Sequence, residues 1–207
     1  MKKLAAALAL SLLPLAFAAQ AEITTTDVVG RKVTVPDVPK RVVLGFYYED
    51  YLAIAGPGSL DRVVGLSLTT WKDWRPKQFA AYEKALPKLK TLPDVGSTDD
   101  NTFSIEKLIA TKPDLLILAT FSAGAIISSG SGTAKEKVAA FEAAGIPVLV
   151  LDYLSQTVDK HVASTLALGK IMGQEKRAQE LADNYRKAFE DIDARIKKAG
   201  PTKKKVY

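Results

Sequence analysis

The order of apolar and polar positions between residues 104 and 118 predicts a helix followed closely by a buried strand. Ser104 is a residue type that caps helix starts. Three apolar side chains then recur at the i, i+3, i+4 spacing of one helix face: Ile105, Leu108 and Ile109. Pro113 cannot continue a helix, and the uninterrupted apolar run Leu115 to Leu118 is typical of a parallel strand buried on both faces. We therefore expect helix and strand to be joined by a very short loop.

Other segments repeat this alternation of helix and strand. Residues 135–144 predict a helix that Gly145 ends, and Pro147 to Leu151 is a second apolar strand. Upstream, two β-branched strands and one helix are predicted: Arg41 to Gly45, Arg62 to Leu66 and Glu49 to Ala55. Two short strands around a turn predict a hairpin before them: Ile23 to Thr26 and Lys32 to Val35. Together these elements predict an α/β fold with a doubly wound, mostly parallel sheet.

The last third of the chain predicts one helix that is longer than a compact domain needs. From Gln174 to Ala199, apolar residues keep a helical period, and Gly200 with Pro201 ends the helix. Residues 203–207 resemble the start of another strand. We therefore expect one lobe, a long helix and the beginning of a further domain.

The N-terminus predicts export. Lys2 and Lys3 precede an apolar stretch from Leu4 to Phe17, and residues 19–21 are those of a signal peptidase site. The apolar stretch is shorter than the roughly 20 residues that span a bilayer. We therefore expect residues 1–21 to be a cleaved secretory signal. The chain has no cysteine, so we expect neither a lipoprotein anchor nor a disulfide framework, but a soluble exported protein.

The composition is that of an ordinary folded domain, with 47% hydrophobic and 25% charged residues among 207. The formal net charge falls from +6 to +4 when Lys2 and Lys3 leave with the signal. Part of that surplus lies at the end of the chain, in residues 203–205. We find no basic patch interleaved with aromatic residues, so a nucleic-acid partner is not expected. A mild preference for anionic ligands is expected.

Seven short motifs in one order resemble the periplasmic binding proteins of iron-siderophore and cobalamin ABC importers: Gly30 to Pro36, Pro39 to Val43, Asp61 to Gly65, Asp94 to Gly96, Ser104 to Leu108, Lys112 to Leu115 and Ala144 to Val148. The resemblance implies two α/β lobes bridged by one long helix, with the ligand in the cleft between the lobes. On this basis residues 22–172 are the N-terminal lobe and residues 173–200 the bridging helix. Residues 201–207 begin a C-terminal lobe that is missing from this chain.

The resemblance also implies a function in binding rather than catalysis. We expect a periplasmic component of an ABC importer, monomeric when full length, that binds an iron(III)-siderophore or a similar metal chelate. It would deliver this ligand to the permease in the inner membrane. The chelator would carry the iron, so we expect no cofactor and no metal site in the protein itself. In the resembling family a glutamate at the position of Glu106 docks with the permease, although a carboxylate there also complements the helix dipole.

Haem or cobalamin, bound by the same fold, is the alternative ligand. A tyrosinate can ligate haem iron, and several tyrosines lie near the expected cleft. Haem-binding relatives, however, tend to place a tyrosine where this chain has Ser97. Direct metal binding is disfavoured, because one histidine and no thiol cannot supply the usual ligands of a zinc or manganese site.

The ligand site is expected at the carboxyl ends of the parallel strands, where open α/β sheets bind their ligands. The segments that follow the predicted strands carry rings and a guanidinium, which suit a bulky, partly apolar, anionic chelate. The candidate ligand-binding residues are Tyr47, Tyr48, Trp71, Trp74, Arg75, Phe121 and Tyr153. Tyr47 and Arg75 are the strongest candidates. For Trp71 and Trp74, packing under a long loop is an equally open interpretation.

An exported serine hydrolase is the alternative from another class. Ser122 follows a predicted strand, as in a nucleophile elbow, but Thr120 stands where that motif has glycine. The single histidine, His161, lies in a predicted helix from 157 to 172 and would be the only general base available. The loop 128–133 lacks the Gly-Lys-Ser/Thr ending of a phosphate-binding loop. A third possibility is a stand-alone interaction module that binds a partner protein through its sheet edge and long helix.

Overall fold

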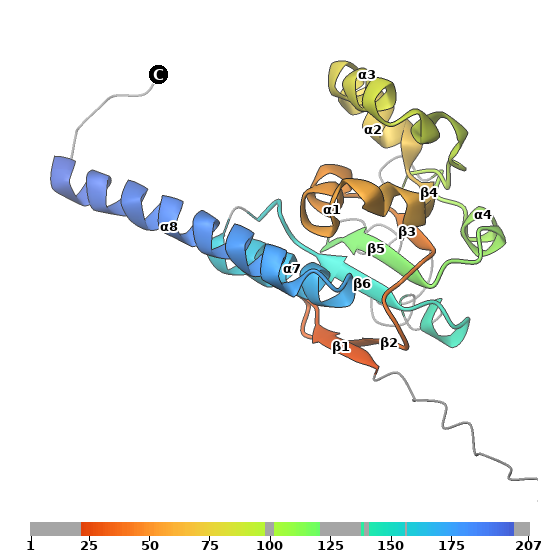
Figure 1. The fold of residues 1–207 in the computed structure, drawn as a ribbon, viewed down its shortest axis with the longest axis horizontal. Helices are drawn as coiled ribbons and strands as arrows, with labels where there is room; N and C mark the ends of the chain where they lie inside the picture. The colour runs from red at the N-terminus through yellow and green to blue at the C-terminus, as the bar shows by residue number, and fades with distance from the viewer. Residues whose placement is uncertain (1–21, 98–101, 121–137, 139–140, 156, 201–207) are drawn as a thin grey trace, which may run out of the picture.

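Figure 1 shows a mixed α/β lobe from which one long helix projects. The computed structural model describes residues 22–97, 102–120, 138, 141–155 and 157–200. Its central sheet has four parallel strands in the order β4-β3-β5-β6. These strands are β3 (Val42–Leu44), β4 (Val63–Leu66), β5 (Leu115–Ala119) and β6 (Val148–Leu151). The predicted fold class is confirmed, and these four predicted strands are present with ends that differ by at most one residue.

Both faces of the sheet are buried, and each face has its own hydrophobic core. One core joins the sheet to α1 (Tyr48–Ala55) and α7 (Val158–Ile171), and its members include Leu44, Ile117, Leu149, Tyr51 and Leu168. The other joins the sheet to α4 (Ile105–Ala110) and Phe141, and its members include Val43, Leu116, Val148 and Leu108. Successive strand residues point to opposite faces, so burial of both faces requires uninterrupted apolar runs. The doubly wound arrangement is therefore confirmed.

Helix α4 begins as the sequence predicts but buries less of itself. The backbone N–H of Lys107 donates to the Ser104 hydroxyl at 3.2 Å, so Ser104 caps the helix. Leu108 is fully buried, whereas Ile105 and Ile109 are 51% and 48% exposed. The predicted apolar face is thus wrong for two of its three members. The helix has only six residues, and Leu108 is the one that it buries against the sheet.

The predicted N-terminal hairpin is present as two antiparallel strands, β1 (Ile23–Thr26) and β2 (Lys32–Val35). Asp27 holds its turn, because its carboxylate accepts hydrogen bonds from the backbone N–H groups of Val29 and Arg31 and from the Arg31 guanidinium. The same guanidinium donates to the Val148 carbonyl at 2.7 Å. The hairpin is thereby attached to the start of β6.

The segment from residue 68 to residue 91, where a long loop was one of the two interpretations for Trp71 and Trp74, is helical. It contains α2 (Leu68–Trp74), α3 (Pro76–Ala85) and the 3-10 helix η2 (Pro87–Thr91), and a further 3-10 helix, η1 (Pro57–Arg62), precedes β4. Pro76 occupies the first position of α3, where its fixed φ favours a helix and its missing N–H costs nothing. In Figure 1, α2 and α3 lie together above the sheet, next to α1.

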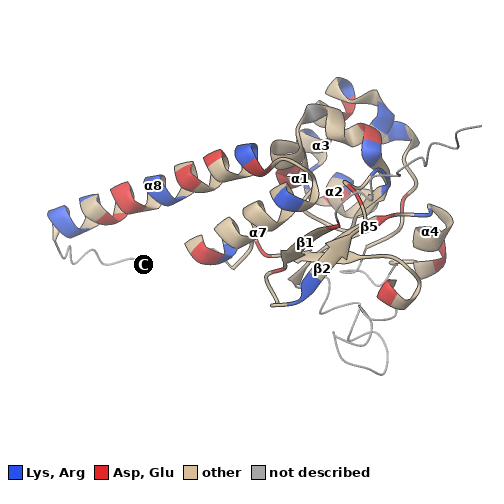
Figure 2. Ribbon diagram, turned by 60° about the horizontal axis from the view of Figure 1, so that its bottom comes forward, with Lys and Arg blue, Asp and Glu red and all other residues tan. Residues whose placement is uncertain are grey.

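Helix α8 (Glu175–Ala199) confirms the predicted long helix to within one residue. Its first half packs on α7 through Ala178 and Ala182, which are both fully buried. Its second half extends beyond the lobe and carries charges of both signs along its length (Figure 2). Three apolar side chains of α8 are exposed: Leu181, Ile192 and Ile196. Within the residues that the structure describes, we find no helix with the length and apolar character needed to cross a membrane.

The close approach of α7 and α8 depends on Gly169. A Cβ added to this glycine would stand 2.1 Å from the Cβ of Ala178, so the two helices would have to move apart. We expect Gly169→Ala to lower the free energy of unfolding by about 1–3 kcal/mol, although alanine has the higher helix propensity. Thermal unfolding followed by circular dichroism measures the effect. Gly58→Ala, where a Cβ would meet nothing within 4 Å, is the control, and equal melting temperatures for the two variants would contradict the prediction.

Candidate functional site

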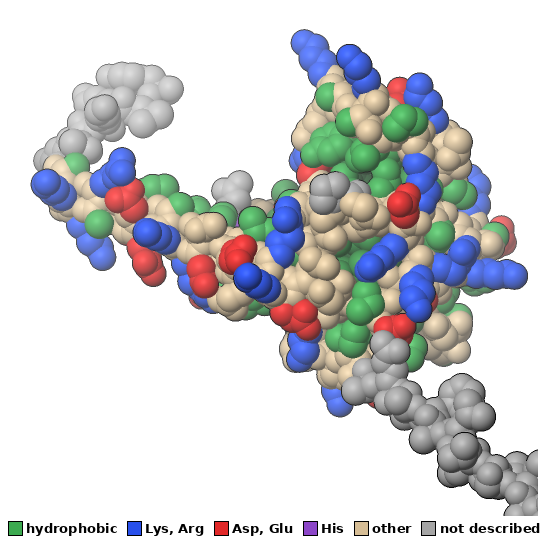
Figure 3. Space-filling view, in the orientation of Figure 1, with side chains coloured by type: hydrophobic (Ala, Val, Ile, Leu, Met, Phe, Trp, Pro, Cys, Tyr) green, Lys and Arg blue, Asp and Glu red, His purple; other side chains and the backbone are tan. Residues whose placement is uncertain are grey.

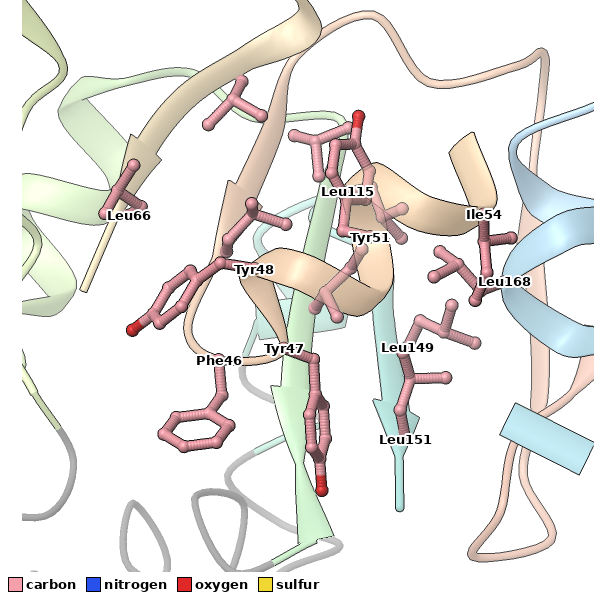
Figure 4. Close-up of a cluster of buried hydrophobic side chains, with 14 of the residues drawn as sticks. Phe46, Tyr47, Tyr48, Tyr51, Ile54, Leu66, Leu115, Leu149, Leu151 and Leu168 are labelled. Atoms are coloured by element: carbon pink, nitrogen blue, oxygen red, sulfur yellow. The ribbon is translucent and has the colours of Figure 1, made fainter. Parts of the chain in front are cut away.

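The strand order creates a topological switch point at the carboxyl ends of β3 and β5. The chain passes from β3 to β4 on one side, and β5 then joins the sheet on the other side of β3. Connections that diverge from such a point leave a crevice, and open α/β sheets bind ligands there. Figure 4 shows Phe46 and Tyr47, which follow β3, pointing toward the ends of β5 and β6. The predicted site residue Tyr47 therefore lies at the switch point.

Tyr47 has an unusual backbone conformation. Its φ of 58° and ψ of 46° lie in the left-handed region, which a bulky residue rarely adopts and which costs of order 1–3 kcal/mol. At this turn the chain leaves β3, and α1 begins at the next residue. The Tyr47 hydroxyl accepts a hydrogen bond from the backbone N–H of Tyr153 at 3.1 Å, and burial raises the pKa of Tyr47 to about 12. The phenol is thus neutral and fixed in place.

An open hollow of about 300 Å³ lies against Tyr47. It brings together three of the predicted site residues, Tyr47, Arg75 and Tyr153. Its remaining lining residues are Phe46, Glu49, Asp50, Gln78, Leu154 and His161. None of these six was among the residues predicted for the site from the sequence. Glu49 and Asp50 directly follow the predicted tyrosines and lie in the first turn of a helix after a strand end. This pair of carboxylates is the sequence signal by which the two residues could have been assigned to the site.

A row of rings connects this hollow to α8. The ring of Tyr153 meets that of Tyr47 edge to face at 4.9 Å and that of His161 at 4.8 Å. His161 then stacks on Tyr185 of α8 with ring centroids 3.7 Å apart. Burial lowers the pKa of His161, so the imidazole is neutral at pH 7. His161, which the sequence places in a predicted helix, thus packs between the hollow and the long helix, a place that only the packing of α7 reveals.

The other predicted aromatic residues divide between core and surface. Trp71 and Tyr48 are buried, and their rings stack at 4.7 Å. The Tyr48 hydroxyl donates to the Ser67 carbonyl at 2.7 Å. Trp74, in contrast, is 58% exposed, with its ring 6.3 Å from that of Phe46 at the edge of the hollow. Of the two open interpretations, burial favours packing for Trp71, while the exposure of Trp74 leaves it accessible to a ligand.

Arg75 is engaged within the chain. Its Nη1 lies 3.3 Å from Oε1 of Glu49, and the indole Nε1 of Trp71 donates to the same oxygen at 3.0 Å. Burial, and next the charge of Glu49, raise the pKa of Asp50 to about 6. From the sequence, the Arg75 guanidinium is expected to be available to an anionic ligand. The structure instead places a carboxylate against that cation and a second carboxylate beside it.

Glu106 lies apart from the hollow, on the exposed surface of α4. Its neighbours Ile105 and Ile109 are exposed as well. In Figures 1 and 2, α4 and the projecting part of α8 lie at opposite ends of the molecule. The predicted site residue Phe121 and the hydrolase candidate Ser122 lie outside the described residues, as do residues 1–21 and 201–207. Among the residues with described positions, no three histidine, aspartate or glutamate side chains are grouped so that they could hold a metal ion.

Comparisons with known proteins agree with this architecture. The molybdate-binding protein MolA of Haemophilus influenzae is 31% identical over 113 residues, 55% of this chain and 30% of its own length. The ABC transporter substrate-binding lipoprotein YvrC of Bacillus subtilis, itself uncharacterized, is 29% identical over 175 residues, 84% of this chain and 48% of its own length. The crystal structure of the TroA-like periplasmic binding protein FepB from Veillonella parvula superposes with a TM-score of 0.77 at 28% identity. That superposition covers 87% of this chain and 51% of FepB.

The chain therefore spans between 30% and 51% of the length of these relatives. In addition, residues 42–207 match the sequence family described as periplasmic binding protein, which is most of the chain. The parallel sheet, the switch-point hollow and the long helix all lie within or at the border of the matched segment. This chain belongs to the periplasmic binding protein family.

Proposed function

We propose that this chain is the N-terminal lobe of an exported substrate-binding protein of an ABC importer. It contributes half of a cleft that binds an iron(III)-siderophore or a similar metal chelate for delivery to a membrane permease. The observation that carries the proposal is the aromatic hollow at the switch point, joined through His161 to the base of α8. Export is supported by the signal-like pattern of residues 1–21 and by the family.

The long helix supports the two-lobe part of the proposal. The described part of α8 continues well past the lobe, and Leu181, Ile192 and Ile196 stay exposed on it. The relatives are about twice as long as the matched segment or longer. A second lobe attached after α8 would cover part of this helix and face the hollow from the other side. In that arrangement α8 is the bridging helix.

The shape and lining of the hollow favour a chelate over a small oxyanion. MolA is named as a molybdate-binding protein, so small ligands occur among the relatives. A small oxyanion is best held by several cations or N–H donors, whereas the only described cation that lines this hollow is already paired with Glu49. Rings at the edge and floor of a hollow of about 300 Å³ suit a larger, partly apolar ligand. Figure 3 shows further hydrophobic side chains around α2 and α3 above this region.

Haem is the less favoured ligand. A tyrosine that ligates haem iron does so as the phenolate. Burial raises the pKa values of both Tyr47 and Tyr153, so their phenols are protonated at physiological pH. The Tyr48 hydroxyl is buried and donates to a backbone carbonyl. The family match argues against a serine hydrolase, because it is a match to periplasmic binding proteins and not to enzymes.

Trp74 should contribute to ligand affinity. Its ring is exposed and lies 6.3 Å from that of Phe46, which lines the hollow, so it can stack on a chelate bound there, and such contacts contribute about 0.5–1.5 kcal/mol. We expect Trp74→Ala to weaken binding of ferric chelates about three- to tenfold in calorimetric titrations. Ile196→Ala, which removes an equally exposed apolar side chain far along α8, is the control and should bind normally. Equal affinity in both variants would count against the proposed site.

Glu106 should act in docking and not in binding. In a full-length protein we expect Glu106→Arg to lower uptake about tenfold, because the reversed charge repels the arginines expected on the permease. Ligand affinity, measured by titration of the purified protein, should not change, since Glu106 is remote from the hollow. Glu180→Arg on α8 reverses a charge at another exposed position and serves as the control. A loss of affinity that matches the loss of uptake would refute the docking role.

A further inference from the structure

One carboxylate in the hollow at the switch point, that of Asp50, has no ion-pair partner among the described residues. The ionisable lining residues of the hollow, apart from the tyrosines, are Glu49, Asp50, Arg75 and His161. Glu49 and Arg75 form an ion pair, and the Glu49 carboxylate also accepts from Trp71. His161 is neutral at pH 7, because burial lowers its pKa. Among the described residues, Asp50 forms no salt bridge, so its carboxylate determines the charge of the hollow.

Other charged and titratable groups around Asp50 do not change the net negative charge of the hollow. Tyr47, Tyr82 and Tyr153 are close enough to feel the charge of Asp50, and all three have raised pKa values and are neutral. Asp152 acts on Tyr47 as well, but its carboxylate is held by Lys160 at 3.0 Å. Arg75 is the one cation that acts on Asp50, and it does so while paired with Glu49.

Rings surround the same space. Phe46 meets Tyr47 edge to face at 5.2 Å, and Tyr47 meets Tyr153 at 4.9 Å. His161 continues this row on the α7 side. Aromatic faces attract alkylammonium groups, and a carboxylate next to them adds direct charge pairing. An anionic group in the hollow would instead face Asp50 with no free cation in the described lining to oppose it.

We infer that the ligand presents a cationic, alkylammonium-like group to this lobe, and that the group lies in the hollow against Asp50 and the surrounding rings. This inference rests on the proposed function and specifies its ligand. It replaces the expectation of a purely anionic chelate. A ferric chelate with a pendant protonated amine has this character, since the iron is held by the chelator and the amine remains free to enter the hollow.

The first experiment compares two probes. Tetramethylammonium chloride is the simplest probe of such a group, and tert-butanol is an uncharged, soluble molecule of similar shape. Binding to the 207-residue chain is followed by NMR chemical shifts and by tryptophan fluorescence. We expect tetramethylammonium to bind at least fivefold more tightly than tert-butanol. Asp50→Asn should abolish this preference, and Asp61→Asn, at an exposed position outside the hollow, should preserve it. Equal binding of both probes, or a preference that survives Asp50→Asn, would overturn the inference.

The dependence on pH gives a second readout. Asp50 is protonated below its pKa of about 6 and charged above it, so cation affinity should rise between pH 5 and pH 7. His161, if protonated at low pH, would repel the cation and change affinity in the same direction. Asp50→Asn separates the two contributions, because only that of His161 would remain in the variant. A pH profile that is unchanged by Asp50→Asn would contradict the role of Asp50. Melting curves confirm that the variant is folded.

A third experiment separates this inference from the proposed function. A ferric trihydroxamate with a free terminal amine is compared with the same chelate after acetylation of that amine. Tighter binding of the amine form, by at least fivefold, supports the inference. Equal binding of both forms leaves the chelate-binding proposal standing and overturns the cationic group. Binding of tetramethylammonium without binding of either chelate supports the cation site and refutes the ferric chelate as ligand.

Discussion

Strand β3 lies between β4 and β5, and this position in the sheet decides where the candidate site can form. This strand is covered on both faces and paired along both edges, so every backbone N–H and C=O group at its ends needs a partner. Asp114, just before β5, supplies part of this by accepting hydrogen bonds from the backbone N–H groups of Lys40 and Arg41 at 2.8 Å. These hydrogen bonds tie the start of β5 to the start of β3. The chain leaving β3 leads to β4 and the chain leaving β5 leads to β6, so the two connections diverge from adjacent strand ends. The candidate site exists because of that divergence.

What occupies the switch point follows from the left-handed turn at Tyr47. The turn brings Phe46 and Tyr47 to the strand ends and places Glu49 and Asp50 in the first turn of α1. Rings from β3, from the end of β6 and from α7 then pack in one row that reaches α8. The hollow and the long helix are consequently parts of one packed unit. Tyr47, Tyr153 and His161 therefore belong both to the lining of the hollow and to the row of rings that reaches α8.

Local periodicity predicted the elements of this fold well, because each strand and long helix repeats one pattern of burial over its whole length. The apolar runs became the four parallel strands, and the predicted helix from residue 174 became α8. The prediction was wrong for α4, where Ile105 and Ile109 are exposed in a helix of only six residues. A helical spacing of apolar residues shows that a face exists, whereas the number of residues that reach the core depends on where the helix lies on the sheet.

The site could be predicted only in part. From the sequence it follows that the aromatic segments come after the strands, and therefore that Tyr47 and Tyr153 lie at the same edge of the sheet. The packing of the folded chain shows in addition that Trp71 is buried, that Arg75 is paired with Glu49, and that Asp50 forms no salt bridge among the described residues. The physical reason is that connectivity fixes which edge of a sheet a residue reaches, while its exposure and the compensation of its charge depend on neighbours that are distant in the sequence.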